Sequence, residues 1–468
     1  MFSRRQFLAA AAATAALRAQ SGRRPNIVFI IADDLGYGDL SCYGQKYFKT
    51  PSIDGLAAEG MRFTQAYSGC TVCAPSRSVL MTGMHMGHTS VRSNPGGVPL
   101  LPSDVTVGEV LKSAGYATGG FGKWGLGDKG TEGVPWKQGF DEFFGYLHQV
   151  HAHFYYPEFL YHNDKRVPLE GNTGGKRTTY SHDVIAERAL EFIRRHKDGP
   201  FFCYMPVTVP HVELLVPEDS LAQHRGKYPE WEYVDKNRHY ADQKEGRAAY
   251  AAMITRLDRD VGRVLSLLNE LKLSDNTIVF FTSDNGAALP IWKENFFEST
   301  AGLRGHKQNM YEGGIRVPMI ARWPGRIPKG ATNDRPWMFQ DLLPTFAEIA
   351  GAKVPVKVDG HSVVPTLLGK HQPPDQFLYW EMPRYNAKSK DFPEEIPMQA
   401  VRMGDWKAVR PQPNGKLELY NLKADPYEQR DVAAQYPKIT ERIEAYLKVA
   451  RTVPRPQSMP EPDFQKPA

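Results

Sequence analysis

Four apolar runs along the chain are each closed by polar residues or glycine. They cover residues 26–32, 116–121, 201–207 and 277–282. Unbroken apolar runs of this length are typical of strands that are buried on both faces of a sheet. Just beyond their ends stand side chains that can do chemistry: Asp33 and Asp34, Lys123, His211, and Asp284 with Asn285.

Helical patterns separate these strands. Apolar residues recur at three- and four-residue spacing over 184–193 and 250–268, directly before the third and fourth strands. Helices that alternate with buried strands predict an α/β fold with a large, mixed but mostly parallel sheet flanked by helices. Ligands of such sheets gather at the carboxyl ends of the strands, so we expect one cleft to collect the polar residues named above.

From about residue 371 the pattern changes to short strands between turn-rich loops. We expect strands at 377–381, 399–402, 406–409 and 417–420 and a helix over 437–449, which together form a small antiparallel sheet with a helix. The predicted organisation is a large α/β domain over 24–370 and a small α+β subdomain over 371–450. Residues 451–468 are rich in proline and charge and are expected to form an extended tail.

The first nineteen residues have the pattern of an export signal. Arg4 and Arg5 precede an apolar, alanine-rich run of about eleven residues and then Arg18-Ala19. A membrane span needs about 20 apolar residues, so this run is too short to be one. The paired arginines indicate a twin-arginine signal peptide over 1–19, and hence an exported protein, periplasmic or extracellular, without a membrane span.

Composition and charge exclude several classes of protein. The chain has 468 residues, 41% of them hydrophobic, with 58 Lys and Arg against 52 Asp and Glu. The formal charge of +6 falls to +3 without the three signal arginines, which implies no nucleic-acid partner. The four cysteines are too few for a disulfide framework, although whether Cys42, Cys70 and Cys203 pair is left open.

The most informative stretch is Cys73-Ala74-Pro75-Ser76-Arg77, which is followed by a short apolar segment and Thr82-Gly83. It resembles the signature of the type I sulfatases of the alkaline-phosphatase superfamily. That resemblance implies an alkaline-phosphatase-like catalytic domain over 24–370 and a maturation enzyme that converts Cys73 to formylglycine, whose hydrate is a geminal diol. Pro75 suits the first turn of a helix, whose positive end would favour sulfate beside residue 73.

Further segments look like the same family, including 50–60, 302–318 and 419–426. The resemblance implies metal ligation by Asp33, Asp34, Asp284 and Asn285, together with the converted Cys73. Hard oxygen donors of this kind suit Ca²⁺ rather than zinc. The remaining candidates are Arg77 for holding the diol, Lys123 and Lys307 for sulfate, His211 for protonating the leaving alcohol, and Arg304 for binding substrate.

One position departs from the family pattern. Many members read G-K-W-H-L-G, whereas this chain has Gly125 where the histidine would stand. Residues 148–157 are rich in histidine and tyrosine, and we hypothesise that His153 supplies the missing imidazole, with His151 as the next candidate. A histidine-rich surface loop, or an adventitious metal site, is the alternative interpretation of this segment.

The residues and the resemblance together predict an exported, Ca²⁺-dependent sulfuric ester hydrolase that acts on a sulfated carbohydrate or an aryl sulfate. Two alternatives stay open at this point. A phosphomonoester or phosphodiester hydrolase of the same superfamily would use the same diol with a different metal. A sulfoglycan-binding protein would keep Cys73 as an unconverted thiol.

Overall fold

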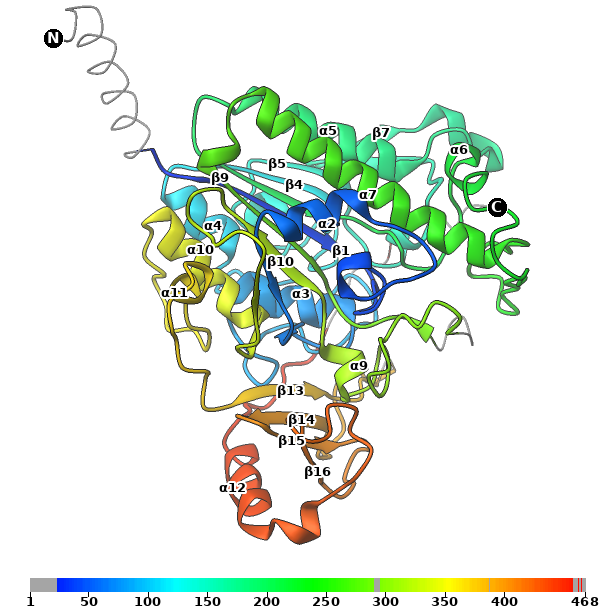
Figure 1. Cartoon of the computed structure of the whole chain (residues 1–468). Helices are drawn as coiled ribbons and strands as arrows, with labels where there is room; N and C mark the ends of the chain where they lie inside the picture. The colour runs from blue at the N-terminus through cyan, green and yellow to red at the C-terminus, as the bar shows by residue number, and fades with distance from the viewer. Residues whose placement is uncertain (1–22, 290–294, 387, 458–461, 463, 465–468) are drawn as a thin grey trace, which may run out of the picture.

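A ten-stranded sheet forms the centre of the molecule (Figure 1). The computed structural model describes residues 23–289, 295–386, 388–457, 462 and 464, so the predicted signal peptide lies outside the described residues. The strand order is β11-β2-β10-β9-β1-β8-β4-β5-β6-β7. In chain order the strands are β1 (Asn26–Ala32), β2 (Met61–Phe63), β4 (Ala117–Lys123), β5 (Glu142–Tyr146), β6 (Phe159–His162), β7 (Lys165–Pro168), β8 (Phe201–Pro206), β9 (Thr277–Ser283), β10 (Met319–Arg322) and β11 (Ala331–Asn333).

The five central strands β9, β1, β8, β4 and β5 run parallel to one another. They include all four strands predicted from apolar runs, and every residue of β1, β8 and β9 is buried. Within the described part of this ten-stranded sheet, antiparallel pairs occur only towards the edges, where β10 joins β9 to β2 and β6 joins β5 to β7. The predicted mixed, mostly parallel α/β fold is therefore confirmed.

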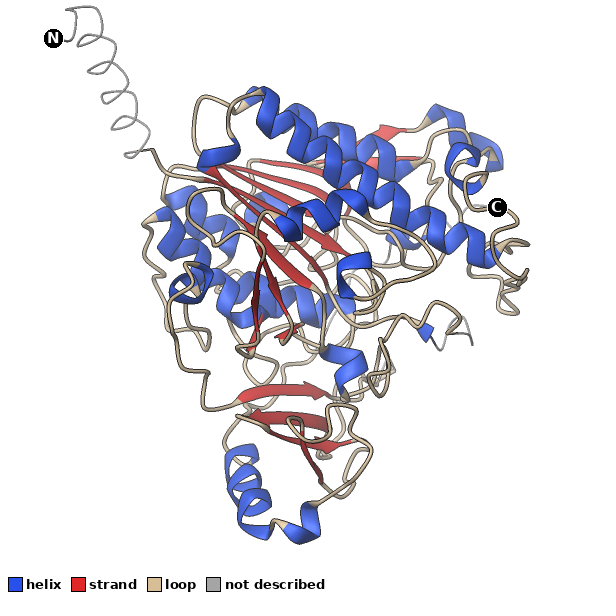
Figure 2. Ribbon diagram, viewed as in Figure 1, coloured by secondary structure: helices blue, strands red, loops and turns tan. Residues whose placement is uncertain are grey.

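Helices cover both faces of this sheet (Figures 1 and 2). Val28 and Ile30 of β1 belong to the core cluster that includes α5 (Ser181–Arg195) and α7 (Gly246–Glu270). Phe29 packs on the opposite face, where its ring lies 5.6 Å from that of Phe346 in α10 (Leu342–Ala350). The alternation along one strand thus creates two separate apolar cores. Other described helices are α2 (Pro51–Ala58), α3 (Cys73–Thr82), α4 (Val107–Ser113), α6 (Glu218–Leu221), α9 (Glu312–Ile315) and α11 (Val364–Leu367).

The C-terminal part forms the predicted antiparallel sheet with a helix, seen at the bottom of Figure 2. Its strands β13 (Leu378–Met382), β14 (Met398–Met403), β15 (Trp406–Arg410) and β16 (Glu418–Asn421) pair in sequence order, and α12 (Pro437–Leu447) follows. A two-stranded sheet of β3 (Ala66–Tyr67) and β12 (Trp337–Met338) completes the described strands. None of the helices in the described residues is long and apolar enough to cross a membrane.

Buried charges join the small subdomain to the large one. The Lys407 ammonium of β15 lies 2.9 Å from a carboxylate oxygen of Glu312 in α9 and 2.8 Å from one of Glu428. All three side chains are fully buried. The segment after α12 also returns to the large domain, where Arg92 donates a 2.7 Å hydrogen bond to the Thr452 carbonyl and Gln457 donates one of 3.1 Å to the Ser90 carbonyl.

Candidate active site

The carboxyl edge of the parallel sheet collects the polar residues as predicted. β1 and β9 are neighbours, so Asp33 and Asp34 after β1 meet Asp284 and Asn285 after β9. Two bonds connect these strand ends: the Asp284 amide donates to the Ala32 carbonyl at 3.0 Å, and the Asp34 amide donates to the Asp284 carboxylate at 3.2 Å. Asp34 adopts a left-handed backbone conformation with φ of 64°, which turns the chain sharply at the strand end.

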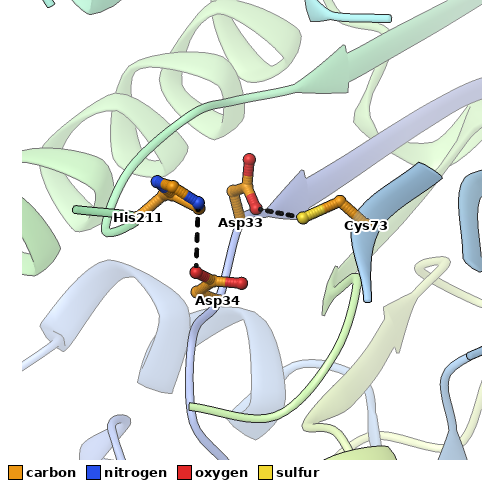
Figure 3. Close-up of side chains that lie close together, drawn as sticks. All are labelled: Asp33, Asp34, Cys73 and His211. Atoms are coloured by element: carbon orange, nitrogen blue, oxygen red, sulfur yellow. Dashed lines mark hydrogen bonds and ion pairs between the residues drawn. The ribbon is translucent and has the colours of Figure 1, made fainter. Parts of the chain in front are cut away.

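Cys73 lies at the start of α3 and reaches into this acid cluster (Figure 3). Its thiol donates to an Asp33 carboxylate oxygen at 3.3 Å and accepts a hydrogen bond from the Lys307 ammonium at 3.5 Å. The residue is 1% exposed. Burial and the nearby charge of Asp33 raise the pKa of the thiol, which therefore stays protonated at neutral pH.

The residues after Cys73 fix α3 to the same strand ends. The Ser76 hydroxyl donates a 2.6 Å hydrogen bond to the Asp284 carbonyl. Arg77 is completely buried and donates to the Asp284 carboxylate at 2.8 and 3.1 Å and to the Lys123 carbonyl at 2.9 Å. One guanidinium fork therefore orients Asp284 and the end of β4 together.

Two buried lysines neutralise the two acids after β1. The Lys123 ammonium lies 2.6 Å from an Asp33 carboxylate oxygen, and the Lys307 ammonium lies 2.7 Å from one of Asp34. Burial opposes ionisation of Asp33, but the charges of Lys123, Arg77 and Lys307 outweigh it and hold its pKa well below the ordinary value. Burial and the neighbouring Asp33 raise the pKa of Asp284 to about 6.

The cluster fits a divalent cation. Ligand atoms of Asp33, Asp34, Cys73 and His211 all lie within 4.8 Å of one another. The side-chain amide of Asn285 donates to Asp34 at 2.7 Å, while its carbonyl oxygen is buried without a hydrogen-bond partner. Buried polar atoms are rarely left unpaired, so this oxygen is available as a metal ligand. Carboxylate and amide oxygens suit a hard cation such as Ca²⁺.

His211 stands beside the acids with one ring nitrogen already engaged. Its Nδ1 bonds to the Val212 carbonyl, so that Nε2, at 3.4 Å from an Asp34 carboxylate oxygen, faces the cluster. Burial lowers the pKa of His211 to about 4. The imidazole of His153 stacks on this ring with centroids 4.6 Å apart.

Sequence reasoning missed two residues beside these histidines, His239 and Tyr240. The Nε2 atom of His239 lies 2.8 Å from Nδ1 of His153, and the Tyr240 hydroxyl lies 3.4 Å from the same nitrogen. Both come from the loop between α6 and α7, which has no hydrophobic period to predict its course. The one feature of the sequence that points to this loop is that His239 and Tyr240 are adjacent.

Two other candidates from the sequence have different surroundings. His151 is buried among aromatic rings, with centroids 5.0 Å from Tyr146 and 4.8 Å from Phe159. Arg304 stacks over Tyr311 at 3.9 Å and donates at 2.8 Å to the Tyr420 hydroxyl and at 2.8 Å to the Glu428 carbonyl. These contacts connect Arg304 to the C-terminal subdomain.

The space beside Gly125 is filled by Gln149. A Cβ atom built on Gly125 would lie 2.9 Å from the carboxamide carbon of Gln149, and the glycine has φ of +76°. Gln149 is 3% exposed and donates a 3.0 Å hydrogen bond to Asn94, which lies at the surface. The carboxamide thus occupies the room that a side chain at position 125 would need, while His153 lies against His211. That His153 supplies the missing imidazole stays a prediction.

Fold and site together define a sulfuric ester hydrolase with an alkaline-phosphatase-like fold. The sulfatase family profile matches residues 25–352, and a profile described as N-sulphoglucosamine sulphohydrolase, C-terminal, matches residues 305–452. The chain belongs to the sulfatase family and is an arylsulfatase-like enzyme that hydrolyses sulfate esters. Sulfatases of this family use formylglycine and a metal, and the buried site around Asp33, Asp34 and Cys73 is consistent with both.

Individual relatives extend over most of the chain. Human arylsulfatase A is 36% identical over 82% of this chain and 75% of its own length. The N-acetylgalactosamine-6-O-sulfatase of Bacteroides thetaiotaomicron is 30% identical over 92% and 94%. Among solved structures, that of Ps i-CgsB in complex with k-i-k-neocarrahexaose has a TM-score of 0.76 and 29% identity, covering 92% of this chain and 93% of that chain.

Proposed function

We propose that the protein is an exported, Ca²⁺-dependent sulfatase that removes sulfate from a sulfated carbohydrate with formylglycine at position 73. One observation carries this proposal. The reactive atom of residue 73 contacts both an acid of the candidate metal site and a lysine, at 3.3 and 3.5 Å. A buried thiol with a raised pKa is a poor nucleophile, so this placement favours a side chain that is oxidised by the maturation enzyme.

The formylglycine and the Ca²⁺ ion of the proposed mature enzyme have separate tasks. A hydrated aldehyde formed from Cys73 would supply an oxygen nucleophile for sulfur and a second hydroxyl whose loss of a proton allows sulfate to leave. Asp33, Asp34, Asp284 and Asn285 would hold Ca²⁺, which supplies positive charge beside the sulfate and the attacking oxygen.

The chain's own cations bind and orient the substrate. Lys123 and Lys307 lie on either side of the acid pair, and their ammonium groups bind sulfate oxygens. Arg77 bonds to Asp284 and to the end of β4, and so fixes the position of these two parts of the site relative to each other. His211 acts as the imidazolium in this step: its Nδ1 proton is held by the Val212 carbonyl, and its Nε2 proton goes to the oxygen of the departing alcohol as the S–O bond breaks. The negative charge of the bound sulfate favours this protonated ring.

The substrate class follows from the relatives and from the surface near His211. One relative is an N-acetylgalactosamine-6-O-sulfatase, and the structure of Ps i-CgsB is a complex with a carbohydrate, k-i-k-neocarrahexaose. His153, His239 and Tyr240 are part-exposed beside the buried His211. Imidazole and phenol groups offer an apolar face and a polar edge, which suits a sugar ring.

Export is part of the same proposal. The twin-arginine pattern within residues 1–19 directs the chain out of the cytoplasm, and the mature enzyme begins after the cleavage site. Cell fractionation of the expressing host, with N-terminal sequencing of the secreted or periplasmic protein, tests this. A full-length chain that stays in the cytoplasm would contradict export without affecting the catalytic proposal.

A comparison of two aryl esters tests the reaction. We expect the purified protein, expressed with a formylglycine-generating enzyme and supplied with Ca²⁺, to hydrolyse 4-nitrophenyl sulfate and to hydrolyse 4-nitrophenyl phosphate far more slowly. Cys73→Ala is the matched inactive variant. Faster turnover of the phosphate would favour the phosphoesterase alternative, and equal turnover by Cys73→Ala would contradict a role for residue 73.

A further inference from the structure

One buried carboxylate joins three segments that are far apart in the sequence. Glu213 is 6% exposed, and its two carboxylate oxygens accept hydrogen bonds from the Tyr155 amide and from the Ala241 amide, both at 3.2 Å. The segments around residues 155, 213 and 241 therefore meet at a single side chain. Burial raises the pKa of Glu213.

Each of these three segments carries a histidine two residues before its contact with this carboxylate. His153 precedes Tyr155, His211 precedes Glu213 itself, and His239 precedes Ala241. His153 connects the other two imidazoles, because it stacks on His211 at 4.6 Å and bonds to His239 at 2.8 Å. We call His153, His211 and His239 the histidine trio.

The trio extends from the catalytic cluster towards the surface. His211 is 2% exposed and faces Asp34, whereas His153 and His239 are part-exposed. Asp235 fixes the backbone at His239, because its carboxylate accepts hydrogen bonds from the amides of His239 and Tyr240 at 2.8 and 2.9 Å. The loop is fixed again where Gln243 donates to the Leu214 carbonyl at 2.8 Å.

We propose that Glu213 is a positioning residue that assembles the histidine trio around the departing alcohol. The proposal rests on the proposed function, in which His211 protonates that alcohol. Loss of one acceptor oxygen leaves a buried amide unpaired, so the segment that carries His153 or His239 would shift relative to His211. Glu213 itself touches no reacting atom and acts only through these rings.

The leaving group provides a measurement that distinguishes positioning from general stabilisation. A phenolate from phenol, whose pKa is close to the value of about 10 for tyrosine, needs a proton as it departs. The more acidic 4-nitrophenol departs readily as the anion. A disturbed trio should therefore slow phenyl sulfate far more than 4-nitrophenyl sulfate, whereas a general loss of folded enzyme would slow both equally.

The test compares Glu213→Gln with Asp258→Asn. Asp258 is a matched control, because it is 4% exposed and its carboxylate accepts from the backbone amides of Ser52 and Ile53 at 3.1 and 2.8 Å. We expect Glu213→Gln to lower kcat/KM for phenyl sulfate about 10- to 100-fold and for 4-nitrophenyl sulfate less than about 3-fold. Asp258→Asn should change both substrates by the same factor.

A second variant keeps the test decisive if Glu213→Gln folds poorly. His239→Gln removes the outer imidazole directly and should show the same leaving-group dependence. Equal losses on both substrates, or no loss, in both variants would overturn the inference. An unsubstituted enzyme that cleaves neither sulfate ester would overturn the proposed function instead, so the two failures are distinguishable.

Discussion

The surroundings of residue 73 keep its thiol protonated and therefore a poor nucleophile. Its Sγ atom lies between the Asp33 carboxylate and the Lys307 ammonium, and burial raises its pKa. The same position beside carboxylates, an unpaired amide oxygen of Asn285 and two lysines suits an oxygen nucleophile that attacks an anionic ester. Individual contacts of this kind explain the signature residues Ser76 and Arg77, which anchor the helix to Asp284.

Gly125 offers a prediction at the same scale. Alanine at this position meets the Gln149 carboxamide at 2.9 Å, whereas alanine at the exposed Gly130, with φ of +86°, meets no atom within 4 Å. Both changes carry the cost of a left-handed backbone, about 1–2 kcal/mol. Because Gln149 is buried, Gly125→Ala should cost about 1–3 kcal/mol more in the free energy of unfolding.

Denaturant unfolding of the two alanine variants measures this difference. In a Gln149→Ala background the extra cost at Gly125 should disappear. If the two glycine variants are equally stable in the presence of Gln149, the carboxamide does not fill the space beside position 125.

At the scale of elements, strand ends could be predicted and loops could not. The acids after β1 and β9 meet because unbroken apolar runs identify two buried parallel strands, whose carboxyl ends share an edge. Glu213, His239 and Gln149 lie in segments without hydrophobic period, so nothing in the sequence indicates which backbone amides or rings they contact. The family resemblance indicates His211, but which side chains lie beside it becomes visible only in the folded structure.

The ion triad between α9 and the small sheet predicts a large stability effect. Lys407→Met leaves Glu312 and Glu428 buried without their common cation and should cost about 3–5 kcal/mol. Arg384→Met is the control, because Arg384 is 70% exposed in its pair with Glu395 and should cost less than about 1 kcal/mol. Equal unfolding midpoints for the two variants would contradict a stabilising role of the triad.

His224 predicts a pH dependence of stability. Its ring nitrogens lie 2.9 Å from the Tyr228 hydroxyl and 3.0 Å from that of Thr255 in α7, and burial, followed by the charge of Lys227, lowers its pKa to about 4. An unfolded histidine has a pKa of about 6.5. The unfolded chain therefore binds the proton more tightly, and stability that is complete above about pH 6.5 is lost as the pH falls towards 4.

Unfolding free energies measured at about pH 7 and about pH 5 check this sign. His224→Gln should reduce the loss of stability between the two conditions, and His371→Gln, at an exposed position, should leave it unchanged. A loss in His224→Gln as large as that of the unsubstituted protein would contradict the prediction.

At the scale of the whole molecule, one charged cluster lies at the carboxyl edge of the large sheet, which has an apolar core on each face. The side chains of the cluster come from several segments that are far apart in the sequence, so the site exists only in the folded chain. The small sheet is connected to the cluster indirectly. Lys407 of this sheet pairs with Glu312 in α9, and Lys307, which precedes α9 in the chain, pairs with Asp34. Binding of a cation at the cluster should therefore stabilise the entire fold.

Removal of metal tests that coupling. EGTA should abolish aryl sulfate turnover and lower the melting temperature, because a ligand at 100 times its Kd stabilises the native state by about 2.7 kcal/mol. Added Ca²⁺ should restore both properties, and Zn²⁺, which prefers nitrogen and sulfur ligands, should not. Full activity and an unchanged melting temperature in EGTA would contradict a calcium site at Asp33, Asp34, Asp284 and Asn285.

The mass of the peptide that contains residue 73 tests the central claim most directly. Conversion of the Cys73 thiol to an aldehyde makes this peptide about 18 Da lighter. Across preparations with different extents of conversion, we predict that specific activity towards 4-nitrophenyl sulfate rises in proportion to the lighter form. Full activity in a preparation whose peptide carries only the unmodified thiol would contradict the account.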